Sequence, residues 1–447
     1  MLPSFLACAL CVAEIVLAQP SSNNDVIQTM YRQGVPHTNR QGEVRLTYDP
    51  DASFFPIGIW GAQLPGKQWD SEADWTLLKE AGFNTVWPWF SPLAQALGAA
   101  EEHDMQLVYM GAVKPEERAL LGSSPHLLGN VWHDEPIGKL GSVDMDALFA
   151  EFNTYRSEIH AVAPELPVFI NDAPWIMAPA TDWWLKWNAA ARVACHDNYP
   201  IMNKKHRARS IGAEPNGIPQ SVSLGVANGE EKRPQWLIVG AFEQPGEYGQ
   251  SFAFRFPTPQ QLRAQVYAGI IHGATGIIYF TWDTYIPRDG RVIGMSPNPK
   301  IAYTPVPQQE GYTKSFPATP MQLAQSRSLW EATTQINAEL EALVPVLLAP
   351  TATESLGLAL AVEGEGVTEN PIRVLAKPRG EQGYTLLTVN LDDAMLRGTF
   401  EFNRPIAEVT TRFENQTPLE LPDGVREFSL SYEPFAVHVI EVTFEVP

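Results

Sequence analysis

The chain has 447 residues, a length that suggests about two or three domains and allows a large buried core. Hydrophobic residues make up 45% of it and charged residues 18%, which excludes a largely disordered chain. The 51 acidic and 31 basic residues give a net charge of −20, so no nucleic acid and no anionic membrane is expected as a main partner.

The first segment, 1–18, resembles a signal peptide. It has an apolar core and ends in the small-residue pattern Val16-Leu17-Ala18. Glu14 lies inside the core and no basic residue precedes it, so an N-terminal membrane anchor is the alternative. The segment is, however, shorter than the ~20 apolar residues that a membrane span needs. Cleavage after Ala18 predicts a secreted protein, extracellular or periplasmic, with no membrane contact.

Strands and helices alternate after a polar lead-in at 19–50. Eight apolar runs are typical of buried strands: 54–61, 85–90, 105–110, 129–136, 167–171, 192–199, 235–242 and 276–282. Helical patterns lie between and after them at 69–82, 91–103, 115–121, 145–162, 182–191, 258–272 and 321–347, with a weak one after Pro219. This alternation predicts an α/β fold, a (β/α)8 TIM barrel over 51–350. A doubly wound sheet is the alternative, but no Gly-rich phosphate loop follows the first strand.

The pattern changes at residue 351. Six short β-rich runs follow, separated by turn signals: 357–362, 372–376, 384–389, 398–402, 425–430 and 435–444. Because no helical pattern lies between them, 351–447 is predicted to form a small antiparallel β-sandwich. Asn415-Gln416-Thr417 in this region is a glycosylation sequon.

Two glutamates end predicted strands. Glu135 closes the fourth, in Gly129-Asn130-Val131-Trp132-His133-Asp134-Glu135-Pro136, and Glu243 follows the seventh. A barrel places its active site at the carboxyl ends of its strands. Strands four and seven face each other across the mouth, where two carboxyl groups approach ~5 Å, the separation typical of double-displacement glycoside hydrolysis. The alternative for each glutamate is an ordinary salt-bridge partner.

The chain resembles clan A of the glycoside hydrolases over about residues 50–350. The clan consists of retaining (β/α)8 enzymes with a glutamate after strand four and another after strand seven. The resemblance implies that Glu135 is the acid/base, Glu243 the nucleophile, Trp282 an aromatic platform under the sugar and Tyr199 a contact of the nucleophile. One position departs from the pattern: Asp134 stands where the clan has an asparagine that bonds the sugar 2-hydroxyl, and an ionised aspartate cannot donate.

Aromatic and polar residues gather near the predicted strand ends, as in sugar sites, where flat rings stack on sugars and polar groups bind hydroxyls. The aromatic candidates are Trp60, Trp87, Trp89, Trp132, Trp175 and Trp282, of which about half are expected to contact sugar. The polar candidates are His133, Asp134, Asn171, Asp172, His196, Asp197, Asn198, Gln244 and Asp283. For His196 a structural, hydrogen-bonded role is the alternative.

The expected partner is an oligo- or polysaccharide. A basic cluster after strand six (Lys204, Lys205, His206, Arg207 and Arg209) suits an acidic sugar, although a solvated loop is the simpler interpretation. The loop around Arg288 and Asp289 is a candidate cover for the site.

No metal and no organic cofactor is expected, because no Cys/His group has ligand spacing. The single cysteine after residue 18, Cys195, is expected to be a small buried residue without a disulfide partner. Two alternatives to a hydrolase stay open: a non-catalytic carbohydrate-binding protein on a glycosidase-like barrel, and a transglycosylase with the same two carboxylates.

Overall fold

The structure is a computed structural model. It describes residues 26–62, 75–89, 91–122, 124–174, 179–202, 211–212, 216–244, 254–282, 292–297, 319–351, 357–364, 371–414 and 418–446. The segment 1–18, Trp175, the 204–209 cluster, the loop with Asp283, Arg288 and Asp289, and the sequon lie outside the described residues.

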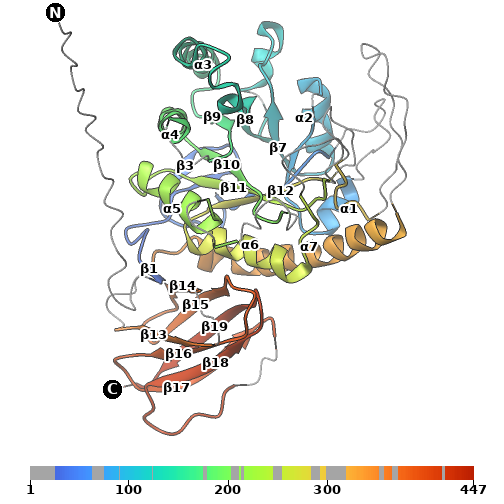
Figure 1. Cartoon of the computed structure of the whole chain (residues 1–447). Coiled ribbons are helices and arrows are strands. Elements are labelled where there is room, and N and C mark those ends of the chain that lie inside the picture. The colour runs from blue at the N-terminus through green and yellow to red at the C-terminus, as the bar shows by residue number, and fades with distance from the viewer. Residues whose placement is uncertain are drawn as a thin grey trace, which may run out of the picture.

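Eight parallel strands form a nearly closed barrel, which confirms the predicted fold (Figure 1). They are β5(Ile57–Trp60), β6(Thr85–Trp87), β7(Gln106–Met110), β8(Leu127–Asp134), β9(Val168–Asn171), β10(Ala194–Asn198), β11(Gln235–Gly240) and β12(Gly276–Phe280). Hydrogen bonds join them in the order β10-β11-β12-β5-β6-β7-β8-β9, so neighbours in the chain are neighbours in the barrel. At the seam between β9 and β10, Nδ2 of Asn171 donates to Oδ1 of Asp197 over 3.0 Å.

Helices surround the barrel: α1(Trp75–Glu80), α2(Leu93–Glu102), α3(Met145–His160), α4(Ala180–Ala190), α5(Ile218–Asn228), α6(Pro259–Ile271) and α7(Pro320–Leu347), with 3-10 turns η1(Pro115–Leu120) and η2(Pro136–Lys139). Thr258 caps α6 as expected, in a capping box with Gln261. Ser91 does not cap α2; its hydroxyl donates to the Trp89 carbonyl, and Pro92 takes the cap position. Among the described helices, none is both long and apolar enough to cross a membrane.

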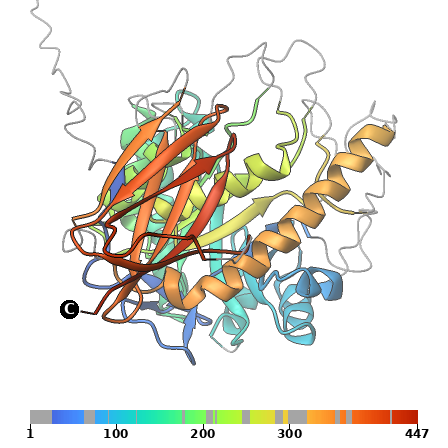
Figure 2. The ribbon, with the colours of Figure 1, turned by 90° about the horizontal axis from the view of Figure 1, so that it is seen from below.

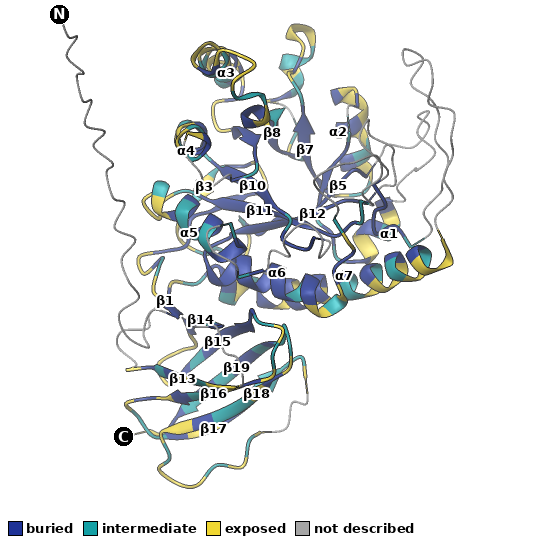
Figure 3. Cartoon of the chain, in the orientation of Figure 1, coloured by how far each residue is buried: buried dark blue, intermediate teal, exposed yellow. Residues whose placement is uncertain are grey.

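The barrel interior is filled by large side chains, because strand residues point alternately inward and outward. Trp60 and Trp87 stack inside it with ring centroids 4.4 Å apart, and Phe169 meets Trp87 edge-on. Cys195 points into the same interior and is fully buried, as expected for a small apolar residue. The barrel strands are accordingly mostly dark in Figure 3, while the helices expose their outer faces. This filled interior leaves the strand ends as the place for a site.

Two further sheets pack as a sandwich, which lies below the barrel in Figure 1 and in front of it in Figure 2. One has the order β1-β14-β15-β19-β17 and the other β13-β16-β18. Their strands are β1(Ile27–Gln28), β13(Ala359–Glu363), β14(Ile372–Pro378), β15(Gly383–Asn390), β16(Leu396–Glu401), β17(Ile406–Arg412), β18(Glu427–Tyr432) and β19(Val437–Phe444). The sequence did not predict β17 or β1. β17 is a partly polar edge strand with a bulge after Ile406, so it lacks a clear apolar run.

The described part of the lead-in, 26–50, contributes to two parts of the fold. Its β1 pairs with β14 of the sandwich, far along the chain. Its remaining strands, β2(His37–Asn39), β3(Val44–Arg45) and β4(Ser53–Phe54), make a small antiparallel sheet. Phe54 of β4 contributes to the barrel interior just before β5 begins.

One arginine links two barrel helices to the sandwich, through an ion pair and a hydrogen bond. Arg263 of α6 donates to Oε2 of Glu339 of α7 over 2.9 Å, and Glu339 also accepts from the hydroxyl of Tyr267. A second guanidinium nitrogen of Arg263 donates to the carbonyl of Val437 in β19, 2.7 Å away. Glu339 is 3% exposed, so its charge depends on these partners.

We therefore expect Glu339→Ala to lower the free energy of unfolding by about 3 kcal/mol, because it removes a buried carboxylate that bonds Tyr267 and leaves the partly buried charge of Arg263 without its partner. Urea denaturation at neutral pH measures this difference. Glu341→Ala, at an exposed position of the same helix, is the control and should change stability by no more than about 0.5 kcal/mol. Equal losses of unfolding free energy in the two variants would show that the ion pair does not stabilise the fold.

Candidate active site

Acidic and amide side chains meet at one edge of the barrel. Asp134 ends β8, Asn171 ends β9, and Asp197 lies one residue before the end of β10; Glu135 and Asp172 directly follow their strands. The carboxyl ends of neighbouring parallel strands lie together at the same edge, so three consecutive strands deliver four carboxyl groups to it. We call Asp134, Glu135, Asp172 and Asp197 the acidic rim.

Glu135 has an unusual backbone conformation. Its φ of +46° and ψ of 54° lie in the left-handed region, which non-glycine residues rarely adopt. The bend is held on both sides: the N–H of Glu135 donates to the Asn171 carbonyl over 2.8 Å, and the N–H of Gly138 donates to the Glu135 carbonyl. Such strain persists where the surrounding structure imposes it, often at functional sites. It turns the chain sharply out of β8 and leaves Glu135 accessible to solvent.

Asn171 is the central donor of the acidic rim. Its Nδ2 donates to Oδ1 of Asp134 over 2.9 Å and to Oδ1 of Asp197 over 3.0 Å. One amide group thus separates two carboxyl groups that would otherwise face each other. Asp172 holds the other side of the rim, because its Oδ2 accepts the backbone N–H of Ile137 over 2.8 Å.

The rim keeps protons at neutral pH. Burial, then the charge of Glu135, raise the pKa of Asp134 to about 7, against the opposing hydrogen bond from Asn171. Burial raises the pKa of Asp172 to about 8, with further contributions from the charges of Glu135 and Asp134. Burial also raises the pKa of Asp197 well above its ordinary value. It raises the pKa of the Glu135 carboxyl group as well. Carboxyl groups this close cannot all ionise, so the rim can supply a proton donor.

Glu243 lies in a different environment. It follows β11, and its backbone pairs with Ile293, each N–H donating to the other carbonyl. Its Oε1 accepts a hydrogen bond from Nε2 of Gln322, near the start of α7, over 2.6 Å. The neighbour of this carboxylate is thus an amide donor, whereas the neighbours of the rim groups are other carboxyl groups.

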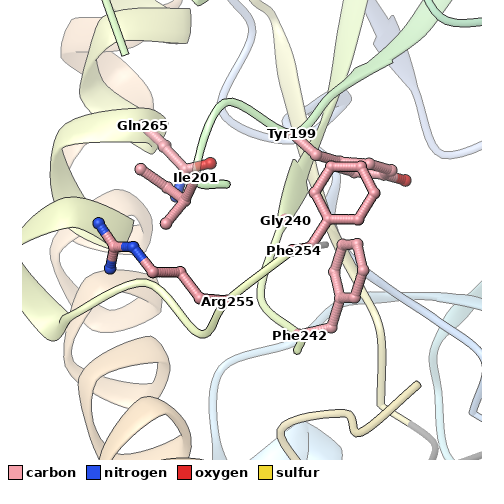
Figure 4. A pocket seen from close by; sticks show the side chains of 7 residues that line it. All are labelled: Tyr199, Ile201, Gly240, Phe242, Phe254, Arg255 and Gln265. Atoms are coloured by element: carbon pink, nitrogen blue, oxygen red, sulfur yellow. The ribbon is translucent and has the colours of Figure 1, made fainter. Parts of the chain in front are cut away.

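Tyr199 follows β10 and is half-buried among aromatic rings. It contacts Phe242 and Phe254 edge-on and stacks on Phe280 with centroids 5.5 Å apart. Figure 4 shows it beside a small cavity that Arg255 and Gln265 also line, together with Ile201, Gly240, Phe242 and Phe254. This cavity has room for about one water molecule and is too small for a sugar.

Several predicted sugar contacts are core residues instead. Trp60 and Trp87 are fully buried inside the barrel. Trp132 points outward and packs between Phe152 and Trp187 under α3 and α4. Trp282 follows β12 as expected, but it is 3% exposed and meets Trp330 of α7 edge-on. A position near a strand end therefore does not by itself expose a side chain at the mouth.

Among the tryptophan candidates that the structure describes, Trp89 keeps a partly accessible ring, which contacts Trp60 with centroids 5.3 Å apart.

Some of the remaining polar candidates bond to neighbouring residues away from the rim, and one has a side chain near the mouth. Nε2 of His133 meets the Lys139 ammonium group, and its Nδ1 bonds the Asp134 carbonyl. Nδ2 of Asn198 donates to the Asn216 carbonyl and to Ser221, away from the rim. The backbone of Gln244 pairs with Phe254, which leaves its half-buried side chain near the mouth.

His196 has the structural role that was the alternative. It is fully buried and bonded to Ser221 and Gln235, and burial lowers its pKa to about 3.

Two features of the site have no clear signal in the sequence. Gln322 lies 79 positions after Glu243, and only folding brings α7 to that carboxylate. The left-handed conformation of Glu135 depends on contacts with β9, although Pro136 does mark a turn there. Within the described residues, no group of His, Cys, Asp or Glu side chains is placed to hold a metal ion.

The acidic rim should make stability depend on pH. With a pKa of about 8 when folded and 3.8 as its ordinary value, Asp172 binds its proton more tightly in the folded state. The free energy of unfolding should therefore fall between pH 4 and pH 8 by up to about 1.4 kcal/mol per pH unit for this group.

Asp172→Asn keeps an oxygen for the Ile137 N–H but cannot ionise, so urea denaturation across this range should show a flatter profile. The control is Asp182→Asn at an exposed position of α4, which should keep the wild-type slope. An unchanged slope in Asp172→Asn would refute the role of Asp172.

No protein-family model matches the chain, and no curated protein is similar to it in sequence. Among solved structures, an apo GH42 exo-carrageenase from Bacteroides ovatus is 10% identical, with a TM-score of 0.44 over 67% of this chain and 55% of its own. A catalytic mutant of a GH42 β-galactosidase from G. stearothermophilus is 10% identical, with a TM-score of 0.46 over 87% of this chain and 98% of its own. A family 5 glycoside hydrolase from Bacteroides vulgatus is 12% identical, with a TM-score of 0.49 over 93% and 95%. The chain spans little more than half the length of the carrageenase, and at this level of similarity these activities do not define the roles of its residues.

Proposed function

We propose that this protein is a secreted glycoside hydrolase that cleaves β-linked glycosides with retention, with Glu135 as the acid/base and Glu243 as the nucleophile. The observation that carries the proposal is the contrast between the two glutamates. Glu135 lies on an acidic rim that favours its protonated form, whereas Glu243 accepts an amide N–H that favours its ionised form. Two carboxyl groups with opposed environments are the basis of double-displacement hydrolysis.

The reaction follows from these two states. Glu135 donates its proton to the glycosidic oxygen while the carboxylate of Glu243 attacks the anomeric carbon, so the bond to the leaving group breaks as a glycosyl ester forms. Glu135, now ionised, takes a proton from water, and the resulting hydroxide displaces Glu243. If a sugar hydroxyl replaces water in the second step, the same residues perform transglycosylation, and product analysis distinguishes the two outcomes.

Asp134 supports this mechanism in an unexpected way. Its Oδ1 accepts from Asn171, so the proton that it holds below a pH of about 7 can reside on Oδ2. A protonated carboxyl group donates a hydrogen bond, as the amide of an asparagine does. Asp134 can thus act as the donor to a sugar hydroxyl that the resemblance leads one to expect at this position.

The substrate is an oligo- or polysaccharide. Trp89 and Tyr199 present partly accessible rings to it, and Asp197, Asn171 and Gln244 add polar groups near the mouth. At a pH high enough to ionise the described rim, its negative charge disfavours an anionic sugar next to Glu135. A charged sugar would instead depend on the basic cluster at 204–209.

The first test is to replace each glutamate. Glu135→Gln and Glu243→Gln should each lower turnover of a β-glycoside at least about 100-fold while the protein stays folded, as circular dichroism checks. Azide should restore turnover to the Glu135→Ala or Glu243→Ala variant by occupying the vacated space. Near-native turnover of both Gln variants on a broad panel of glycans that wild type cleaves would contradict the proposal.

Asp134→Asn tests the second role. Its amide donates at every pH, whereas Asp134 loses its proton as the pH rises through about 7. The ratio of kcat/KM in the variant to kcat/KM in wild type should therefore rise between pH 6 and pH 8. A variant about 100-fold slower than wild type at pH 6 would instead show that Asp134 acts as a carboxylate.

A further inference from the structure

The contact between Gln322 and Glu243 is short and sheltered. Nε2 of Gln322 lies 2.6 Å from Oε1 of Glu243, and Gln322 is 8% exposed. A hydrogen bond to an ionised acceptor contributes more than one between neutral groups, and more again where water is excluded.

A second set of bonds determines which atom of Gln322 faces the carboxylate. Oε1 of Gln322 accepts the backbone N–H of Thr319 over 3.0 Å, and Oγ1 of Thr319 accepts the N–H of Gln322 over 3.2 Å. These are the two bonds of a capping box at the start of α7. Because the oxygen of the planar amide is committed to a donor, its nitrogen must be the group that points to Glu243.

The backbone of Glu243 is held by the same helix. Glu243 pairs with Ile293 through two hydrogen bonds of 3.0 and 2.8 Å. Ser326, one turn after Gln322, is fully buried, and its hydroxyl lies within hydrogen-bond distance of the carbonyls of Gly294 and Ser296, which follow Ile293 in the chain. The first two turns of α7 thus set both the position of Glu243 and the direction of its carboxylate.

We propose that Gln322 is a positioning residue for the nucleophile: its amide fixes the orientation of the Glu243 carboxylate and favours its ionised form. This inference rests on the proposed function of Glu243. Gln322 would then have two roles: it completes the capping box of α7, and it orients the carboxylate of Glu243.

Gln322→Glu separates the two roles. Glutamate also serves at this position of a capping box, so the cap and the stability of α7 are kept, but the N–H donor is replaced by a second carboxylate. The variant should lower kcat about 10- to 100-fold and move the acidic limb of the pH profile to higher pH, and its melting temperature should fall more at neutral than at acidic pH because two carboxyl groups then face each other. Gln261→Glu, in the matching capping box of α6, is the control and should leave kcat and the pH profile unchanged.

A readout without turnover distinguishes failure of this inference from failure of the proposed function. In protein labelled with 13C at glutamate carboxyl carbons, the Glu243 signal, assigned with Glu243→Gln, should titrate at higher pH in Gln322→Glu than in wild type. Wild-type titration together with wild-type kcat would overturn the role of Gln322. A shifted titration supports it, and if wild type then cleaves no glycoside of the panel, it is the proposed function that fails.

Discussion

The carboxyl groups at the mouth of the barrel cannot all carry a charge at once, and the rest of the candidate site depends on this limit. Barrel closure brings the ends of β8, β9 and β10 together, and with them Asp134, Asp172 and Asp197. Burial raises the pKa of Asp172 and Asp197, and the like charges beside them add to the effect. A single amide, that of Asn171, separates two of the groups and spans the seam of the barrel.

The two glutamates have different neighbours. Glu135 stands beside groups that keep protons, so it is suited to donate one. Glu243 lies where its carboxylate meets an amide donor, so it is suited to remain ionised. The opposition arises from the fold: strands four to six carry the acids, and the helix after strand eight carries the donor.

Helix α7 joins the parts of the molecule. Its first turn contacts Glu243 through Gln322. Its middle binds the end of α1 through Asn337 and the base of α6 through Glu339, and its carboxyl end accepts the buried ammonium group of Lys377 from the sandwich. A perturbation of the interface between barrel and sandwich therefore acts on the element that holds the proposed nucleophile.

The sequence by itself determined the order of the eight barrel strands, the helices between them and the places of both glutamates. It could do so because a strand buried on both faces is a continuous apolar run, and because parallel strands present their carboxyl ends at one edge. It could not predict β1 or β17, since pairing over long chain separations and an edge strand with a bulge leave no local pattern. Nor could it decide the direction of Trp132 or Trp282, because a shift of one residue in a strand exchanges the inner and outer faces. Tertiary structure alone decided which tryptophans are core, how close the acids of the rim lie, and that Gln322 meets Glu243. These contacts depend on how strands and helices pack, and the local sequence around each residue does not specify that packing.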